Sequence, residues 1–185
     1  MRIISGQWRS RPLIAPKGEI TRPTADRTRE TLFSMLASRL GSFEDLAILD
    51  LFAGSGALGL EALSRGAATC TFVEHDAAAL KALEFNIEKF GAKAQSDIRR
   101  SSVLSLGSAI KPFDVILMDP PYASGAGSVA LDKLGRLGWF ASSAWISIET
   151  SNKEDVDVKG FAADNVRSIG KARLTLLRPK SDDRP

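Results

Sequence analysis

Two short motifs constrain the fold of this chain, and each follows an apolar run. The first, Asp50–Gly59, overlaps the end of residues 47–52 and contains three glycines, and the second is Asp-Pro-Pro-Tyr at 119–122, after residues 113–118. Apolar, β-branched runs of this length predict buried parallel strands. Ligands of an open α/β sheet bind beyond the carboxyl ends of its strands, where the strand order reverses, so both motifs are predicted to face one crevice.

Strand and helix patterns alternate along most of the chain. Apolar runs predict strands at 47–52, 69–73, 98–101, 113–118, 144–148, 166–169 and 173–177. Apolar residues at helical spacing predict helices near 24–40, 58–65, 80–90 and 129–134. This alternation predicts an α/β fold with a doubly wound, mostly parallel sheet and helices on both faces. The last two strands, joined through Gly170-Lys171, are expected to form an antiparallel hairpin.

Positive charge is concentrated at the N-terminus. Residues 1–29 hold seven basic and two acidic side chains, whereas the formal net charge of all 185 residues is only +3. A basic segment beside a nearly neutral domain is typical of proteins that contact nucleic-acid phosphates, although a solvated basic tail is the alternative. Residues 2–14 are predicted to form a small hairpin, and Trp8 either stacks on RNA or anchors it. The candidate RNA-binding residues are Trp8, Arg9, Arg11, Arg22, Arg27 and Arg29.

The length predicts one domain with a small extension. We expect a basic N-terminal hairpin and helix over 1–41, an α/β domain over 42–178 and a disordered tail over 179–185. No apolar run is long enough to span a membrane. The single cysteine, Cys70, cannot form an intramolecular disulfide and is expected to be buried in a strand. A cytoplasmic monomer is therefore predicted.

The glycine motif is compatible with two classes of cofactor. Residues 54–59 match G-x-G-x-x-G, and Glu74 lies 20 residues beyond Gly54, which also fits an NAD-binding unit. Three observations favour S-adenosylmethionine instead. First, Phe52 and Ala53 separate Asp50, the acidic residue at the strand end, from the glycines. Second, the chain is too short for a second catalytic domain. Third, a dinucleotide-binding site would not explain the Asp-Pro-Pro-Tyr motif.

For S-adenosylmethionine, each part of the cofactor has a predicted partner. Asp50 is expected to receive the charged amino-acid end, and Glu74 to accept hydrogen bonds from both ribose hydroxyls. The glycines let the backbone approach closely because they lack a Cβ. His75, the only histidine, is expected at the rim rather than as a catalytic base. The candidate cofactor-binding residues are Asp50, Phe52, Ala53, Gly54, Ser55, Gly56, Glu74, His75 and Ser102. No metal site is predicted.

The Asp-Pro-Pro-Tyr turn is suited to an amino group on a planar base. Its prolines remove two N–H donors, so the turn offers carbonyl acceptors. The Asp119 carboxylate and the Pro120 carbonyl can accept both hydrogens of an exocyclic NH2, which directs the nitrogen lone pair at a sulfonium methyl group. Tyr122 offers a stacking face for an extruded base. These three residues are the predicted catalytic set. No cysteine accompanies the turn, which excludes cytosine-C5 chemistry.

With these motifs, the chain resembles the class I S-adenosylmethionine-dependent methyltransferases that methylate amino groups. More closely, it resembles the bacterial 16S ribosomal RNA guanine-N2 methyltransferases. The resemblance covers nearly the whole chain and is carried by residues 2–9 (Arg-Ile-Ile-Ser-Gly-Gln-Trp-Arg), 22–33, 50–56 and 119–122. It implies a Rossmann-like seven-stranded sheet and methylation of one guanine, guanine 966 in standard rRNA numbering, within the small ribosomal subunit or its assembly intermediate. Such enzymes often place Asp or Asn against the cofactor's adenine, where this chain has Ser101-Ser102.

Two other functions remain open from the sequence. An adenine-N6 methyltransferase on DNA or RNA would use the same turn, although no added target-recognition domain is visible. A non-catalytic RNA-binding factor for ribosome assembly could retain the fold. The presence of Asp50, Gly54, Gly56, Glu74 and Asp119 together argues against that second alternative.

Overall fold

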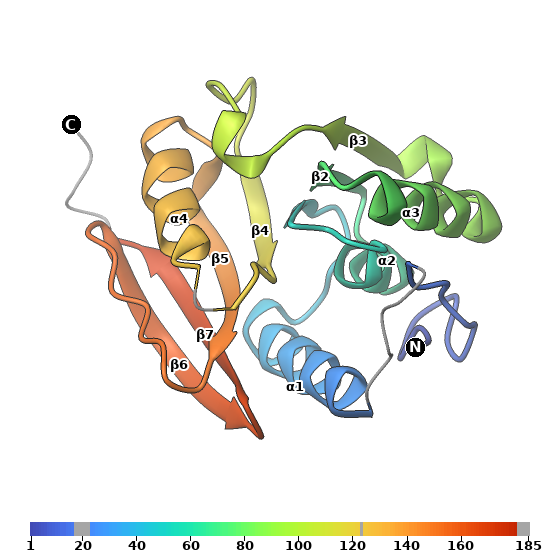
Figure 1. The fold of residues 1–185 in the computed structure, drawn as a ribbon, viewed down its shortest axis with the longest axis horizontal. Helices are drawn as coiled ribbons and strands as arrows, with labels where there is room; N and C mark the ends of the chain where they lie inside the picture. The colour runs from blue at the N-terminus through green and yellow to red at the C-terminus, as the bar shows by residue number, and fades with distance from the viewer. Residues whose placement is uncertain (17–22, 123, 181–185) are drawn as a thin grey trace.

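A seven-stranded sheet organises the computed structural model, which describes residues 1–16, 23–122 and 124–180, without side-chain detail at Pro23 and Thr24. The strand order is β3-β2-β1-β4-β5-β7-β6 (Figure 1). The first five strands pair in parallel, and β7 pairs antiparallel with both β5 and β6. The predicted α/β fold class with its antiparallel C-terminal hairpin is thereby confirmed.

The described strands are β1 Ala47–Leu51, β2 Thr69–Glu74, β3 Ser96–Arg100, β4 Phe113–Met118, β5 Phe140–Ser151, β6 Phe161–Ile169 and β7 Ala172–Pro179. The α-helices are α1 Pro23–Leu40, α2 Ala57–Ser64, α3 Ala77–Phe90 and α4 Ala126–Arg136, with short 3₁₀ turns η1 Lys93–Gln95 and η2 Val103–Ser105. Most predicted elements are recovered. The strand β3 begins two residues earlier than predicted, and β5 is much longer than 144–148.

The hydrophobic core has two layers because successive strand residues face opposite sides of the sheet. On one side, α1, α2 and α3 pack against Ile48, Phe72 and Leu117. On the other side, α4 and η2 pack against Leu49 and Ile116. The predicted placement of helices on both faces therefore holds.

The C-terminal residues continue the sheet further than predicted. Pro179 belongs to β7, where it lies opposite Phe161 of β6. The Lys180 N–H donates to the Gly160 carbonyl at 2.8 Å. The predicted disordered tail therefore does not begin at 179, and residues 181–185 lie outside the described residues.

The first sixteen residues, called the arm here, fold against α2 and α3 (Figure 1). A single antiparallel bridge joins Arg2 and Pro12, and backbone hydrogen bonds link Ile3 with both Ser10 and Arg11, so the predicted hairpin is present but shorter than two strands. Three arm side chains, Ile3, Trp8 and Leu13, are buried in the same core as α1 and α3. The arm is thus packed into the α/β domain rather than set apart from it.

Side chains of α2 hold the backbone of the arm near the turn of its short hairpin. The fully buried Glu61 carboxylate accepts the backbone N–H of Ile4 at 2.7 Å and of Ser5 at 3.0 Å. The Ser64 hydroxyl accepts the N–H of Trp8 at 3.0 Å. Because every buried backbone donor needs a partner, these distant side chains satisfy donors that the short hairpin does not pair.

Candidate active site

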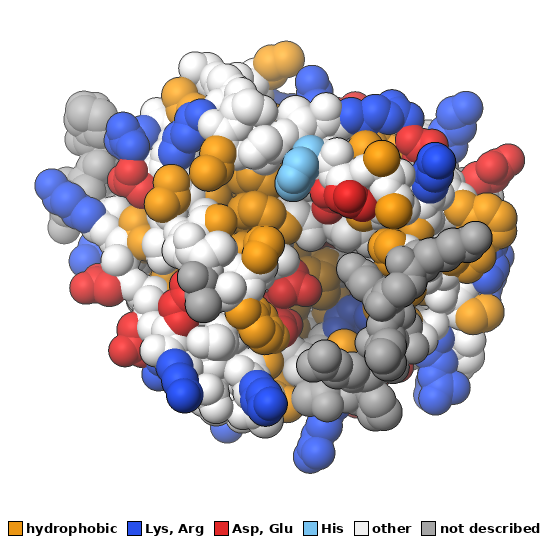
Figure 2. Space-filling view, in the orientation of Figure 1, with side chains coloured by type: hydrophobic (Ala, Val, Ile, Leu, Met, Phe, Trp, Pro, Cys, Tyr) orange, Lys and Arg blue, Asp and Glu red, His pale blue; other side chains and the backbone are white. Residues whose placement is uncertain are grey.

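A cavity of about 1440 Å³ opens at the carboxyl ends of β1, β2, β4 and β5. The sheet order places it between β1 and β4, where the chain reverses its winding direction, as expected for an open α/β sheet. The glycine loop, the end of β2 and the Asp-Pro-Pro-Tyr turn all contribute to its lining. Figure 2 shows this hollow, in which hydrophobic side chains gather between acidic ones. Its volume is large enough for a nucleoside cofactor and a base together.

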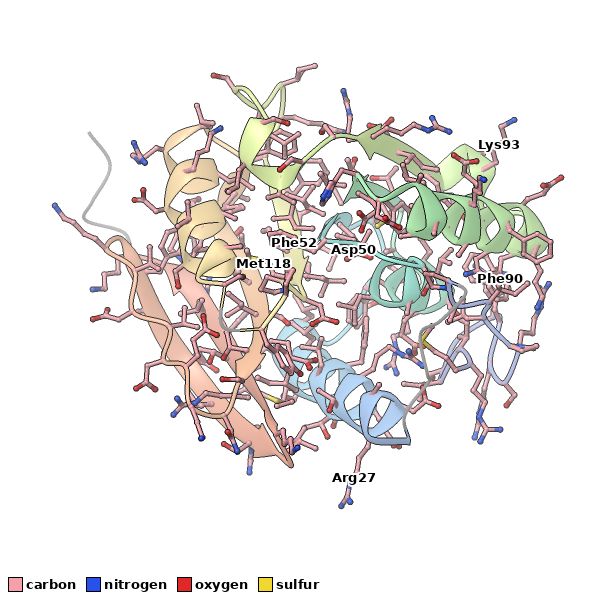
Figure 3. The ribbon with its side chains drawn as sticks, viewed as in Figure 1. Arg27, Asp50, Phe52, Phe90, Lys93 and Met118 are labelled. Carbon is pink, nitrogen blue, oxygen red and sulfur yellow. The ribbon has the colours of Figure 1, made fainter. Side chains whose placement is uncertain are left out.

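Every second residue from Phe52 to Gly56 in the glycine loop has a positive φ angle. Phe52, Gly54 and Gly56 have φ values of 61°, 55° and 80°. Positive φ is rare for a bulky residue, and such strain persists where the surroundings impose it, often at ligand sites. The Phe52 side chain lines the cavity, close to Asp50 and Met118 at the centre of the molecule (Figure 3). Ala53 and Ser55 also line it.

Alanine at Gly54 and at Gly56 is expected to produce different defects. A Cβ at Gly54 meets nothing within 4 Å and borders the cavity, so Gly54→Ala should lower the free energy of unfolding by only about 1 kcal/mol while weakening cofactor binding. A Cβ at Gly56 would lie 2.4 Å from Leu83 Cδ1, so Gly56→Ala should cost about 2–4 kcal/mol of stability. Urea denaturation and titration with S-adenosylhomocysteine measure the two effects. Equal stability losses would contradict this distinction.

Asp50 lies beneath the glycine loop. Its side chain is 1% exposed, and its carboxylate accepts the Gly59 N–H at 2.8 Å. Desolvation raises the pKa of Asp50 well above its usual value, the Gly59 hydrogen bond opposes this shift, and the negative charges of Asp119 and Glu74 add to it. Asp50 thereby holds the first turn of α2, and it is not among the residues that line the cavity. Its contact with a cofactor stays a prediction.

Glu74 ends β2 and lines the cavity with little exposed surface. One carboxylate oxygen accepts the Gly54 N–H at 2.9 Å. The other accepts the N–H groups of His75 at 2.6 Å and Asp76 at 2.8 Å. This network holds the carboxylate against the glycine loop, and an ionised carboxylate has further lone pairs for hydroxyl donors. The His75 side chain is 70% exposed and lies at the rim, which fits its predicted place.

Ser102 does not line the cavity. Its hydroxyl accepts the Leu104 N–H at 3.3 Å and so caps η2. The neighbouring Val103 lines the cavity instead. The structure therefore offers an apolar side chain where the sequence prediction placed Ser102 as a polar contact.

The Asp-Pro-Pro-Tyr turn follows β4 and meets the glycine loop across the cavity. Asp119, Pro120 and Tyr122 all line it. Tyr122 is 48% exposed, and its hydroxyl donates to the Glu149 carboxylate at the end of β5. The three predicted catalytic residues thus line the same cavity as Gly54 and Glu74.

The structure separates the predicted RNA-binding residues into two groups. Trp8 is buried and stacks on Phe90 with ring centroids 5.1 Å apart, and Arg29 is 4% exposed with its guanidinium donating to the Arg2 carbonyl at 2.5 Å. Both residues anchor the arm, so Trp8 takes the second of its two predicted roles, and the prediction of Arg29 as an RNA contact is wrong.

The other predicted RNA-binding arginines that the structure describes differ in how far they are exposed. Arg11 lies over the Phe90 ring at 4.6 Å and donates to the Lys89 carbonyl at 2.6 Å, so it also holds the arm to α3. Arg9 and Arg27 are exposed, and Arg27 projects from α1 into solvent (Figure 3). Arg22 lies outside the described residues.

Asn86 joins the arm to the glycine loop and was missed by the sequence prediction. Its fully buried amide accepts the Ile14 N–H at 2.9 Å and donates to the carbonyls of Ile14 at 2.9 Å and Ser55 at 3.0 Å. A signal for it exists, because Asn86 interrupts the apolar face of α3 between Leu83 and Phe90. A polar residue on such a face needs a buried partner.

Replacing Asn86 should loosen both the arm and the loop. Asn86→Ala leaves two carbonyls and one N–H without this partner, so we expect a loss of about 2–4 kcal/mol in the free energy of unfolding. Urea denaturation measures the loss, and limited proteolysis reports release of the arm. Asn165→Ala on strand β6 is the matched control and should cost less than about 1 kcal/mol. If Asn86→Ala lowered the free energy of unfolding as little as Asn165→Ala does, Asn86 would not connect the arm to the loop.

Neither a metal site nor a membrane span is found within the part of the chain that the structure describes. No group of three or more His, Cys, Asp or Glu side chains there could hold a metal ion. None of the described helices has the length and apolar character needed to cross a membrane.

The sheet and the cavity define a protein of the α/β methyltransferase fold. The magnesium protoporphyrin IX methyltransferase of Synechocystis, solved with bound S-adenosylmethionine, superposes with a TM-score of 0.67 over 88% of this chain and 87% of that chain. Its sequence is 12% identical, so the likeness concerns the fold alone. The Escherichia coli protein yhhF superposes with a TM-score of 0.86 and 36% identity over 98% of this chain and 99% of that one.

Sequence comparison identifies the family. Residues 1–178 match the family described as Conserved hypothetical protein 95. Ribosomal RNA small subunit methyltransferase D of Escherichia coli K12 is 41% identical over 150 residues, which cover 81% of this chain and 74% of that protein. The protein of the same name from Haemophilus influenzae is 38% identical over 154 residues, covering 81% and 78%. The chain therefore belongs to the family that contains ribosomal RNA small subunit methyltransferase D.

Proposed function

We propose that this protein transfers a methyl group from S-adenosylmethionine to the N2 amino group of a guanine in 16S ribosomal RNA. The main support is one cavity in which the glycine loop and the Asp-Pro-Pro-Tyr turn face each other. The names of its relatives support a small-subunit ribosomal RNA substrate. By the resemblance, the target is guanine 966 in the small subunit or its assembly intermediate.

The lining of the cavity fits the proposed cofactor. Space is open on the side of Gly54 where a Cβ would point, and Glu74 is fixed beside it by three backbone N–H groups. Glu74 would accept the ribose hydroxyls, while Asp50 supports the loop from below. Val103 would pack against the adenine ring. When bound, S-adenosylmethionine supplies an electrophilic methyl group on its sulfonium.

The proline turn would hold the guanine for in-line attack. The Asp119 carboxylate and the Pro120 carbonyl accept the two N2 hydrogens, which turns the nitrogen lone pair toward the methyl group. Tyr122 stacks on the extruded base, a contact worth about 1–3 kcal/mol that helps offset the few kcal/mol of unstacking. Holding the reacting atoms in this alignment is the main catalytic effect. The N2 nitrogen would take the methyl group and release one of its hydrogens as a proton, for which the Asp119 carboxylate that accepts that hydrogen would be the acceptor.

Radiolabel transfer to defined nucleic acids tests this function. Undermethylated small subunits, naked 16S RNA and DNA are each incubated with the protein and labelled S-adenosylmethionine, and the nucleosides are separated. We expect N2-methylguanosine in the small-subunit sample. N6-methyladenosine would overturn the guanine assignment, and absence of transfer with retained RNA binding would favour an assembly factor.

Cofactor binding is checked separately by isothermal titration. S-adenosylhomocysteine should bind, whereas NAD should give no heat. Binding of NAD alone would refute the choice of cofactor.

A further inference from the structure

Glu149 is a carboxylate at the cavity that the proposed reaction does not yet use. Strands β4 and β5 pair in parallel with Met118 opposite Ile148, so the next residue of each strand, Asp119 and Glu149, lie side by side. Neighbouring strands are about 4.8 Å apart, a spacing at which two side chains can converge on one ligand. Both carboxylates line the same cavity.

Tyr122 connects this carboxylate to the base-stacking position. The Tyr122 hydroxyl donates a hydrogen bond to Glu149 Oε1. Burial raises the pKa of Glu149, and the hydrogen bond from Tyr122 opposes that rise because it stabilises the charged form. An ionised carboxylate accepts hydrogen bonds only, and its two oxygens have room for a second donor beside the tyrosine hydroxyl.

The edge of guanine presents two neighbouring kinds of donor. Its N2 amino group meets Asp119 and Pro120 in the proposed reaction, and its N1–H lies next to that amino group. Adenine presents an amino group next to an N1 lone pair, which a carboxylate would repel. We propose that Glu149 accepts the N1–H of the target guanine and is the residue that selects guanine over bases with an unprotonated N1. This inference rests on the proposed function and assigns the specificity of the same site.

The competing explanation is that Glu149 only positions the Tyr122 ring. The two roles differ in what they do to substrates. A positioning role affects every base that stacks on Tyr122, whereas an N1–H contact affects only the choice between bases with and without that hydrogen. 2-Aminopurine keeps the C2 amino group of guanine but has an unprotonated N1.

The experiment compares guanine with 2-aminopurine at the methylated position. Small subunits are assembled from ligated 16S RNA that carries either base there, and kcat/KM is measured for the parent, Glu149→Gln, Tyr122→Phe and Glu88→Gln. We expect the parent to prefer guanine by about 100-fold, since a site built for a donor rejects an analogue that lacks it. In Glu149→Gln the amide can donate to N1, so the preference should fall below about 10-fold.

The control variants separate the two explanations. Tyr122→Phe removes the hydroxyl and keeps the ring, so it should leave the preference within about 3-fold of the parent, whatever it does to the rate. Glu88 lies exposed on α3, and Glu88→Gln should change neither rate nor preference. If Tyr122→Phe lowers the preference as far as Glu149→Gln does, Glu149 acts through Tyr122 and the proposal is wrong.

Two further outcomes are decisive. A parent protein that methylates 2-aminopurine as well as guanine overturns the proposal even if Glu149→Gln does not fold. A parent that forms N2-methylguanosine, with an unchanged preference in Glu149→Gln, overturns this inference alone. A parent that methylates a different base overturns the proposed function, and this inference with it.

Discussion

Asp119→Ala should lower kcat by about 10²–10³-fold while leaving the affinity for S-adenosylhomocysteine within about 2-fold of the parent. The carboxylate stands on the β4 side of the cavity, across from the Gly54 and Glu74 positions proposed to hold the cofactor. Its loss removes one acceptor for the N2 hydrogens, so the nitrogen lone pair is no longer directed at the methyl group. Binding of the cofactor does not depend on that acceptor.

Single-turnover transfer to small subunits and isothermal titration check the two halves of this expectation. Asp157→Ala, an exposed aspartate between β5 and β6, is the matched control and should retain full turnover. Tyr122→Ala should also lose most of its turnover without losing cofactor affinity, because base stacking is removed. Methyl transfer within a few-fold of the parent in Asp119→Ala would remove this residue from the mechanism.

The positions of the two ligand-binding turns could be predicted from sequence because each follows a strand of nearly uninterrupted apolar residues. Strands β1 and β4 were located to within one residue at each end, and their parallel pairing puts the turns together. The ends of β5 were missed. Its first half contains Ser142 and Ser143, which are exposed and dilute the apolar pattern, so only the buried centre near 144–148 was recognised.

The arm was less predictable because its hydrogen bonds are long-range. Three of its backbone N–H groups donate to Glu61 and Ser64, which lie 56 or 57 residues further along the chain. Local propensity does not report such partners. The same reason explains why Arg29 was counted with the surface arginines, since nothing in its neighbourhood of the sequence shows that it is 4% exposed.

Glu149 illustrates a different limit. In the sequence it is a single acidic residue after the predicted strand, with no motif around it. Many acidic residues in such places have no role in a binding site. Its proximity to Asp119 depends on which strand pairs with β4, and the sequence did not specify that β5 is the neighbour. Function at this position is visible only once the register is known.

Four exposed basic residues are candidates for contacts with RNA phosphates. Arg9 and Arg27 belong to the arm and to the start of α1. Lys153 follows β5 and Lys171 lies in the β6–β7 turn, and both line the cavity. An RNA strand that delivers a base to Tyr122 must reach this cavity, so we expect the two lysines to contact its phosphates, while RNA contacts of Arg9 and Arg27 stay a prediction. The two lysines were not part of the sequence prediction.

Neutralising either pair should therefore weaken RNA binding and make the affinity for RNA depend less on salt concentration. Removing one basic side chain from a phosphate lowers the slope of log affinity against log salt concentration by about 0.7–0.9. The double variants Arg9→Gln/Arg27→Gln and Lys153→Gln/Lys171→Gln should each lower the slope by about 1.4–1.8, and their combination by about 2.8–3.6. Affinity for S-adenosylhomocysteine should stay unchanged, because none of the four residues belongs to the proposed cofactor-binding set around Gly54 and Glu74.

Filter binding of small subunits across a salt series measures these slopes. Lys93→Gln/Lys111→Gln is the matched control, because both lysines precede their strands and so lie at the opposite edge of the sheet from the cavity (Figure 3 labels Lys93). This control should keep the parent slope. A slope lowered by the Lys153/Lys171 pair alone would mean that RNA enters along the C-terminal hairpin, and that the arm acts only by bracing the glycine loop through Asn86.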